Sequence, residues 1–257
     1  MKHIHKYIII IVLLIGHILV AQIRPNSKRN QEAIREYGFS IFSVADAKSD
    51  SIRILAFLSV PNHVLQFLKK KDGFEAQYEA TISLKRKKGN LVGRRNWSNK
   101  LKTINYLEST SKEILTIHQV EFKVVPGDYV ISAELLDGDS KNSGVREKEL
   151  KYSEHKGDLA LYTPFFLDYL SGNWGLDDNE IPMFQNIMGA KVTRASFFVS
   201  GKIKPEPYIL EVTVLSSKKK ELWKKSFESN SKEEYFHQRI IIPDKIAKQG
   251  LRKKVDI

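Results

Sequence analysis

The chain contains no cysteine among its 257 residues. This absence excludes disulfides, thiolate metal sites, thiol nucleophiles and an N-terminal lipid attached through cysteine. Only four histidines follow the first 21 residues, and no two of them lie within five positions of each other: His63, His118, His155 and His237. The short His spacings of metal motifs are therefore missing. The sequence predicts no metal site and no cofactor, and stability has to come from a packed core.

Catalytic motifs are missing as well, since the chain has no G-x-S-x-G elbow and no glycine-rich phosphate loop. The segment from Asp137 to Asn142 alternates oxygen-bearing side chains as a calcium loop does. However, Lys141 and Lys148 occupy positions where further oxygen ligands belong. A turn between two strands is the preferred interpretation. We therefore expect a protein that is not an enzyme and has no catalytic residue.

Long apolar runs are absent except at the N-terminus. There, Lys2 and Lys6 precede an apolar run from Tyr7 to Val20 that ends at Ala21. This layout is typical of a secretory signal peptide, and the run is shorter than the roughly 20 apolar residues of a membrane span. We expect a signal peptide over 1–21 and a flexible lead-in over 22–37. An uncleaved anchor, which would be the chain's one membrane contact, is the alternative.

The net charge of +12 is distributed in short basic clusters beside predicted turns. Solvated rims and strand edges explain such clusters, because lysines at an edge discourage unwanted strand pairing. The alternative is contact with an anionic envelope surface or polysaccharide. An exported protein rarely meets nucleic acid, so we expect no nucleic-acid partner.

The clearest pattern is an alternation of apolar and polar residues from Phe74 to Lys85. Only an antiparallel strand with one face on a core and one in water produces this period. Similar runs, among them one over 52–60 that we interpret as half-buried, are separated by turn residues and give about eight strands between Gly38 and Tyr152. They predict an immunoglobulin-like β-sandwich over 38–152. Tyr129, just after Pro126 and Gly127, is expected to form its tyrosine corner.

A linker over 153–158 leads into a second β pattern over 159–257. The fold class is therefore expected to be all-β, with two immunoglobulin-like antiparallel sandwiches in tandem. The last residues resemble the start of a further strand near Leu251, so we expect the second sandwich to be incomplete. Between its first two strands, 164–189 is expected to be a long irregular insertion.

The insertion is rich in aromatic side chains, and a patch of aromatics can stack on a sugar ring or bind a partner. The candidate contact residues are Phe165, Phe166, Tyr169 and Trp174. The alternative is that these side chains fill the interface between the two sandwiches.

Several turn and core segments resemble the N-terminal region of bacterial GWxTD domain-containing proteins. The resemblance rests on Val60-Pro61, Leu65-Gln66-Phe67, Lys71-Asp72-Gly73-Phe74-Glu75-Ala76, Gly89-Asn90, Arg94-Arg95-Asn96-Trp97 and Pro126-Gly127-Asp128-Tyr129. It implies β-sandwich modules of an exported protein whose function is poorly characterised. The Gly-Trp-x-Thr-Asp motif itself is absent. No functional residue can be transferred, and we expect the chain to be a fragment or a truncated gene product that lacks the family-defining domain.

Together these features predict a non-enzymatic binding or scaffold module in the periplasm or on the outer surface of a bacterium. Its partner would be an envelope protein or a polysaccharide. The alternative is an accessory β-sandwich part of a larger envelope enzyme, or a carbohydrate-binding module.

Overall fold

The computed structural model describes residues 34–47, 50–153, 159–169, 180–182, 195–216, 218–229, 232–243 and 245. The predicted signal peptide, most of the lead-in, nearly all of the linker and Trp174 lie outside these ranges. Within them the chain is almost entirely antiparallel β-sheet, with a single four-residue α-helix, α2 (Tyr106–Ser109). The all-β prediction is confirmed. None of the described helices is long and apolar enough to cross a membrane.

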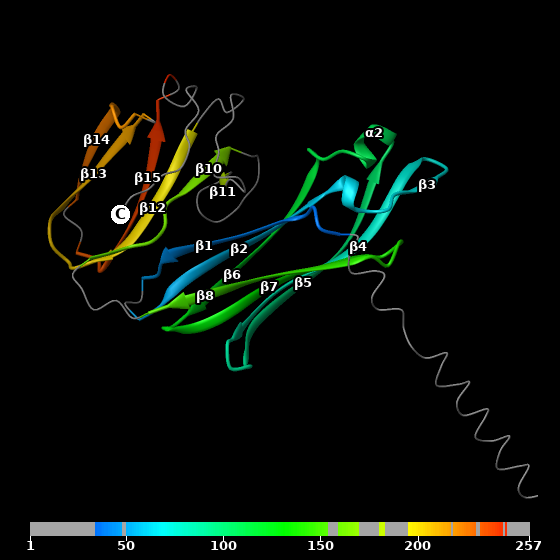
Figure 1. Cartoon of the computed structure of the whole chain (residues 1–257), viewed down its shortest axis with the longest axis horizontal. Helices are drawn as coiled ribbons and strands as arrows, with labels where there is room; N and C mark the ends of the chain where they lie inside the picture. The colour runs from blue at the N-terminus through cyan, green and yellow to red at the C-terminus, as the bar shows by residue number, and fades with distance from the viewer. Residues whose placement is uncertain are drawn as a thin grey trace, which may run out of the picture.

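The first part of the chain forms a sandwich of two sheets (Figure 1). One sheet has the order β1-β2-β6 and consists of β1 (Gly38–Ala45), β2 (Ile52–Pro61) and β6 (Leu115–Val124). In the other, β4 pairs with β3, β5 and β7, and β7 pairs with β8. Its strands are β3 (Leu68–Lys70), β4 (Gly73–Arg86), β5 (Leu91–Thr103), β7 (Gly127–Asp137) and β8 (Ser143–Tyr152).

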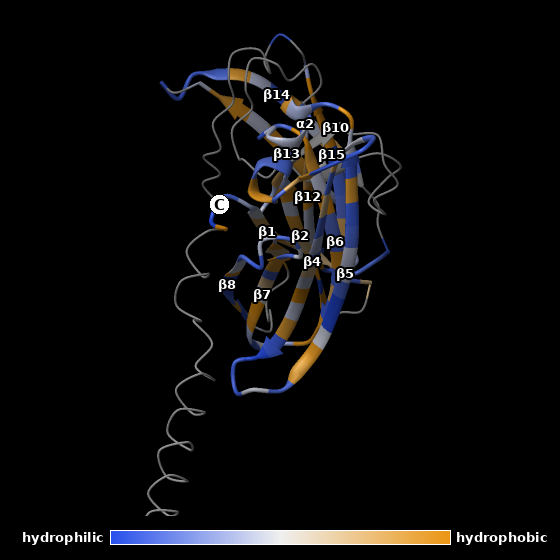
Figure 2. Cartoon of the chain, turned by 90° about the vertical axis from the view of Figure 1, so that its right-hand side faces the viewer, coloured by the Kyte–Doolittle hydropathy of each residue, from blue (hydrophilic) through white to orange (hydrophobic). Residues whose placement is uncertain are grey.

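Strand β4 shows why the two sheets pack together. Phe74, at the start of the alternation, is half-buried. The other apolar members are at most 1% exposed: Ala76, Tyr78, Ala80, Ile82 and Leu84. They form one core with the inward side chains of β2 and β7, and the alternation appears as apolar and polar bands along β4 and β5 in Figure 2. The predicted strand is confirmed.

The prediction that the strand over 52–60 is half-buried was wrong, because β2 is buried on both faces. Its inward residues are buried as expected, but Leu55 and Phe57, which face the other way, are only 1% and 0% exposed. They pack against Phe165 and Phe198 from a later part of the chain. The sheet containing β2 is therefore covered on both faces, which is why β2 is a nearly continuous apolar run.

The tyrosine corner is confirmed. The Tyr129 hydroxyl donates a hydrogen bond of 2.7 Å to the carbonyl oxygen of Val125, and the side chain is 1% exposed. This bond closes the turn between β6 and β7, as in immunoglobulin-like sandwiches.

The core begins before the predicted end of the flexible lead-in. Ile34 and Tyr37 are 3% and 2% exposed and belong to the sandwich core. The Tyr37 hydroxyl donates to the carbonyl oxygen of Ala133 at 3.1 Å, and the Arg146 guanidinium lies 5.0 Å from the centre of its ring. Residues 34–37 are thus part of the folded unit.

The remaining strands form a second group. The order β11-β10-β12-β15, with β9 also on β12, gives one sheet, and β13 and β14 form a separate hairpin. The strands are β9 (Leu159–Leu161), β10 (Phe165–Tyr169), β11 (Glu180–Pro182), β12 (Ala195–Ile203), β13 (Tyr208–Leu215), β14 (Glu221–Ser229) and β15 (Tyr235–Ile242). Sheet and hairpin share a core around Val199, Phe236 and Ile240.

The prediction that 164–189 is irregular throughout was wrong, because β10 and β11 lie within it. Strand β10 has no apolar–polar alternation in its sequence. It exists through pairing with β12, in which Phe165 lies opposite Phe198. Such long-range pairing leaves no local pattern to recognise.

Candidate functional site

The two groups of strands meet at an aromatic contact. Phe165 of β10 is 2% exposed, and its ring centre lies 4.6 Å from that of Phe42 and 5.4 Å from that of Phe198. Phe165 thus fills the contact between the two groups of strands, as expected if the aromatic side chains of the insertion serve packing. Phe166 and Tyr169 belong to β10, but their side chains, like Trp174, fall outside the described residues. A contact role for these three stays a prediction.

Polar contacts at the end of β1 also connect the two groups of strands, and we call this region of contact the joint. The Ala45 backbone N–H donates to the Ser200 hydroxyl at 3.2 Å, and His237 Nε2 donates to the Ala45 carbonyl at 3.0 Å. Burial lowers the pKa of His237, and the bond to Ala45 opposes this shift. Ser200 and His237 lie opposite each other on the paired strands β12 and β15. The second group of strands therefore binds both the backbone N–H and the backbone carbonyl of Ala45.

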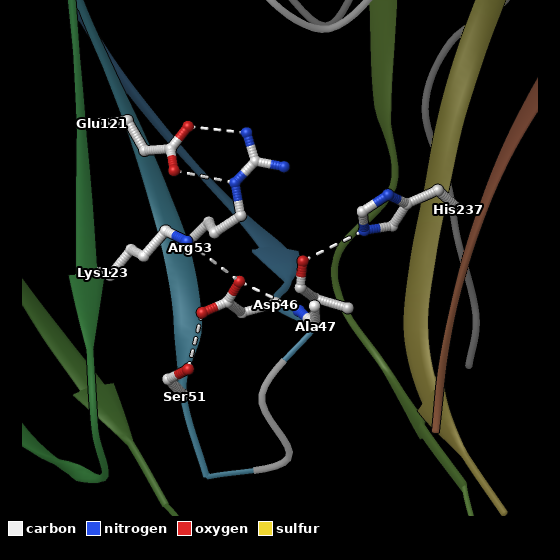
Figure 3. A network of polar contacts seen from close by, with 8 residues as sticks. Asp46, Ala47, Ser51, Arg53, Glu121, Lys123 and His237 are labelled. Carbon is white, nitrogen blue, oxygen red and sulfur yellow. Dashed lines mark hydrogen bonds and ion pairs between the residues drawn. The ribbon is translucent and has the colours of Figure 1, made fainter. Parts of the chain in front are cut away.

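Asp46, the next residue, is 4% exposed and has its carboxylate fully engaged (Figure 3). Its Oδ2 accepts from the Ser51 hydroxyl at 2.7 Å, and its Oδ1 accepts from the Ala47 N–H at 2.9 Å. Lys123 Nζ lies 3.5 Å from Oδ1. Burial alone would raise the pKa of Asp46, but the Ser51 bond and the Lys123 charge outweigh it and lower the pKa.

Beside this carboxylate, Arg53 and Glu121 form a two-pronged ion pair. Arg53 Nε and Nη2 donate to the two Glu121 oxygens at 2.8 and 2.6 Å, the geometry in which a guanidinium binds a carboxylate most specifically. The hydrogen bond to Glu121 raises the pKa of Arg53. The two residues project from β2 and β6, which are neighbours in the sheet.

An open pocket of about 360 Å³ lies at the joint, and it is lined by Asp46, Arg53, Glu121 and Lys123. Its walls also include Tyr235 and His237 of β15. Both of its carboxylates are already bound by cations or hydroxyl and amide donors, and all of these partners belong to the first group of strands. Sequence reasoning missed this site, although one signal existed: Arg53 is the single charged residue in the apolar run of β2.

The Asp137 turn is confirmed as a connection between β7 and β8. Asp137 is 1% exposed; its Oδ2 accepts from the Gln66 N–H at 2.6 Å, and its Oδ1 accepts from the Asp139 N–H at 2.9 Å. These bonds fix the turn and attach it to the segment before β3. In the part of the chain that the structure describes, no group of three potential metal ligands occurs.

His118 lies on β6 and is 5% exposed. Its Nε2 lies 2.9 Å from the Tyr78 hydroxyl, which accepts a bond of 3.1 Å from Asn99. The Trp97 ring lies 4.8 Å away between centres. Burial lowers the pKa of His118 to about 4, so this histidine is a neutral core residue at physiological pH.

No protein-family model matches the chain, and no curated protein matches it. Among solved structures, it is similar to Bacteroides uniformis beta-glucuronidase, with a TM-score of 0.30 and 12% identity, over 58% of this chain and 15% of that chain. A calcium binding mutant of Bacteroides uniformis beta-glucuronidase 2 gives a TM-score of 0.30 and 14% identity, over 53% of this chain and 14% of that chain. The chain thus spans 14% to 15% of the length of these two proteins. A likeness at this level assigns the chain to no family.

Proposed function

We propose that this protein is an exported, non-enzymatic binding or scaffold module of a bacterial cell envelope, built from two β-sandwich units in tandem. The basic and apolar pattern of residues 2–21 supports export. Absence of cysteine fits a protein that depends on its core alone in an oxidising compartment. The resemblance to GWxTD domain-containing proteins supports the same location.

The observation that carries the proposal is the mutual engagement of the charged groups at the joint. Glu121 is held at two points by Arg53, and Asp46 is held by Ser51, Ala47 and Lys123. A general base or nucleophile needs a group free to react with substrate. These side chains instead bind one another within the first group of strands, and the polar bonds that cross to the second group are those of Ala45 to Ser200 and His237. Such mutual pairing is expected of a scaffold.

Loops, more than sheet edges, are suited to bind a partner here. Within the described residues β5 pairs with β4 alone, which leaves its other edge open to solvent. That strand carries Arg94, Lys100 and Lys102 as exposed cations, and such charges discourage addition of another strand. Recognition through the loops at the end of the sandwich is therefore favoured.

The second candidate is an accessory β-sandwich part of a larger envelope enzyme, or a carbohydrate-binding module. The two candidates differ in the sequence encoded downstream of Ile257 and in the role of Trp174. Downstream DNA that continues in frame into a Gly-Trp-x-Thr-Asp or catalytic domain would favour the accessory role. Loss of glycan-array binding in Trp174→Ala would favour the carbohydrate role.

Turnover measurements test the non-enzymatic assignment directly. Purified protein incubated with chromogenic glycosides, glucuronides and esters is expected to release no more product than buffer does. The matched variant Glu121→Gln removes the charge of one pocket carboxylate and keeps its shape, so it is expected to give the same background. Product release by the wild type that disappears in Glu121→Gln would show that the joint pocket is catalytic.

A further inference from the structure

The segment between β5 and β6 presents the two most exposed large apolar side chains of the described part of the chain, Ile104 and Leu107, with Tyr106 between them. Ile104 is 86% exposed, Leu107 74% and Tyr106 61%; we name these three residues the apolar tip. Ile114 and Leu115, at the end of the same segment, are 43% and 41% exposed. Clustered apolar exposure of this kind marks an interaction site.

The apolar tip is held in place by hydrogen bonds. Asn105 Oδ1 accepts from the Leu107 N–H at 2.9 Å and so caps α2. Farther along the segment, the Asn62 side chain donates to the Glu108 carbonyl at 2.9 Å, and the Asn62 N–H donates to the Ile114 carbonyl at 3.0 Å. These bonds hold the backbone of the segment in one conformation, which reduces the entropic cost of binding.

A basic turn flanks the apolar tip. Gly73 lies so close to Ile104 that a Cβ on the glycine would come within 3.2 Å of the Ile104 Cα. The end of β3 and the turn that follows carry Lys69, Lys70, Lys71 and Asp72, a net charge of +2. The segment of the apolar tip itself carries Glu108, Lys112 and Glu113, so the two segments together have a net charge of +1. Among the described residues no carboxylate pairs with these three lysines. In Figure 1, α2 and β3 lie together at the end of the sandwich away from β13 and β14.

We propose that the apolar tip inserts into the surface of an anionic lipid bilayer, with Lys69, Lys70 and Lys71 against the headgroups. Apolar side chains beside lysines bind such membranes by combining burial with electrostatic attraction. Tyrosine is favoured at the level of the headgroups. The inference rests on the proposed function only in that an exported protein meets an envelope membrane.

Other occupants fit the apolar tip less well. A stable protein interface uses about 20–30 residues a side, far more than these three side chains provide. A symmetric contact with a second copy would place the two basic turns close together, and like charges across an interface are unfavourable. A bilayer, in contrast, needs only local insertion and supplies negative charge.

The absence of cysteine gives a direct test. Leu107→Cys in the full chain, labelled with an environment-sensitive fluorophore, is expected to brighten and shift to the blue with phosphatidylcholine vesicles that contain phosphatidylglycerol. Pure phosphatidylcholine vesicles are expected to give a much weaker response. The matched control is Ile209→Cys, since Ile209 is 67% exposed but lies on β13; it is expected to stay unchanged. The label reports its own surroundings, and Ile209→Cys controls for recruitment of the chain to vesicles through its apolar N-terminal run.

Replacing Lys69, Lys70 and Lys71 together by glutamine in the labelled Leu107→Cys chain is expected to weaken binding roughly 100-fold. No response at residue 107, an equal response with neutral vesicles, or a response that depends on protein concentration without lipid would each overturn the proposal. The last result would indicate a second copy as the occupant. None of these results alters the turnover test, so the proposed function is judged separately.

Discussion

Phe57→Ala is expected to lower the free energy of unfolding by about 3–5 kcal/mol, the loss typical of a large aromatic side chain removed from a core. Phe57 is 0% exposed, and it lies on the face of β2 that points away from the first sandwich core. Its environment includes Phe165 and Phe198 from the second group of strands. Urea unfolding followed by intrinsic fluorescence measures the loss.

Two matched variants make this prediction specific. Leu58→Ala, on the opposite face of β2 and also 0% exposed, is expected to cost about 2–5 kcal/mol. Ile209→Ala, at an exposed position, is expected to change stability by no more than about 0.5 kcal/mol. If Phe57→Ala behaved like Ile209→Ala, the outer face of β2 would be open to solvent and the two groups of strands would not be joined there.

Lowering the pH is expected to remove about 3 kcal/mol of stability through His118 alone, since each pKa unit is worth about 1.4 kcal/mol. The pKa of this residue is about 4 in the folded protein, against 6.5 for an unperturbed histidine. Between these values the unfolded chain binds a proton that the folded chain excludes. The stabilisation is complete above about pH 6.5 and is lost as the pH falls to about 4.

His118→Gln isolates this contribution, because glutamine can still bond to Tyr78 but does not titrate. Carboxylates with lowered pKa values, such as Asp46 and Glu75, lower the stability of both wild type and variant at acid pH. Their contribution therefore cancels in the difference between the two unfolding free energies. The difference in unfolding free energy between wild type and variant is therefore expected to change with pH in favour of the variant as the pH falls. A difference independent of pH would mean that His118 is accessible to protons in the folded state.

Local sequence patterns were sufficient to predict a strand that has one face in the core and the other exposed to solvent. Strand β4 is the clearest example, since five of the six apolar residues in its alternation line the core and only Phe74 is half-buried. The tyrosine corner was also predictable, because Pro126 and Gly127 mark the turn that Tyr129 closes. In both cases the information lies within a dozen neighbouring residues.

The joint between the two groups of strands could not be predicted in the same way. Burial of Leu55 and Phe57 requires Phe165 and Phe198, more than 100 positions later, and β10 becomes a strand only by pairing with β12. The pocket residues Asp46, Arg53 and Glu121 look like ordinary surface charges along the sequence. Arg53, as the single charge in an apolar run, was the one available hint of an ion pair at this position.

Export of this chain as an envelope module, as proposed above, is tested most directly by the mass of the protein recovered from cells. The full 257-residue chain with a C-terminal tag is expressed in a bacterium, cells are fractionated, and the tagged protein is analysed by intact mass spectrometry. We expect a protein in the envelope fraction that begins at Gln22, with residues 1–21 removed. A chain that keeps Met1 and stays in the cytoplasmic fraction would contradict the account.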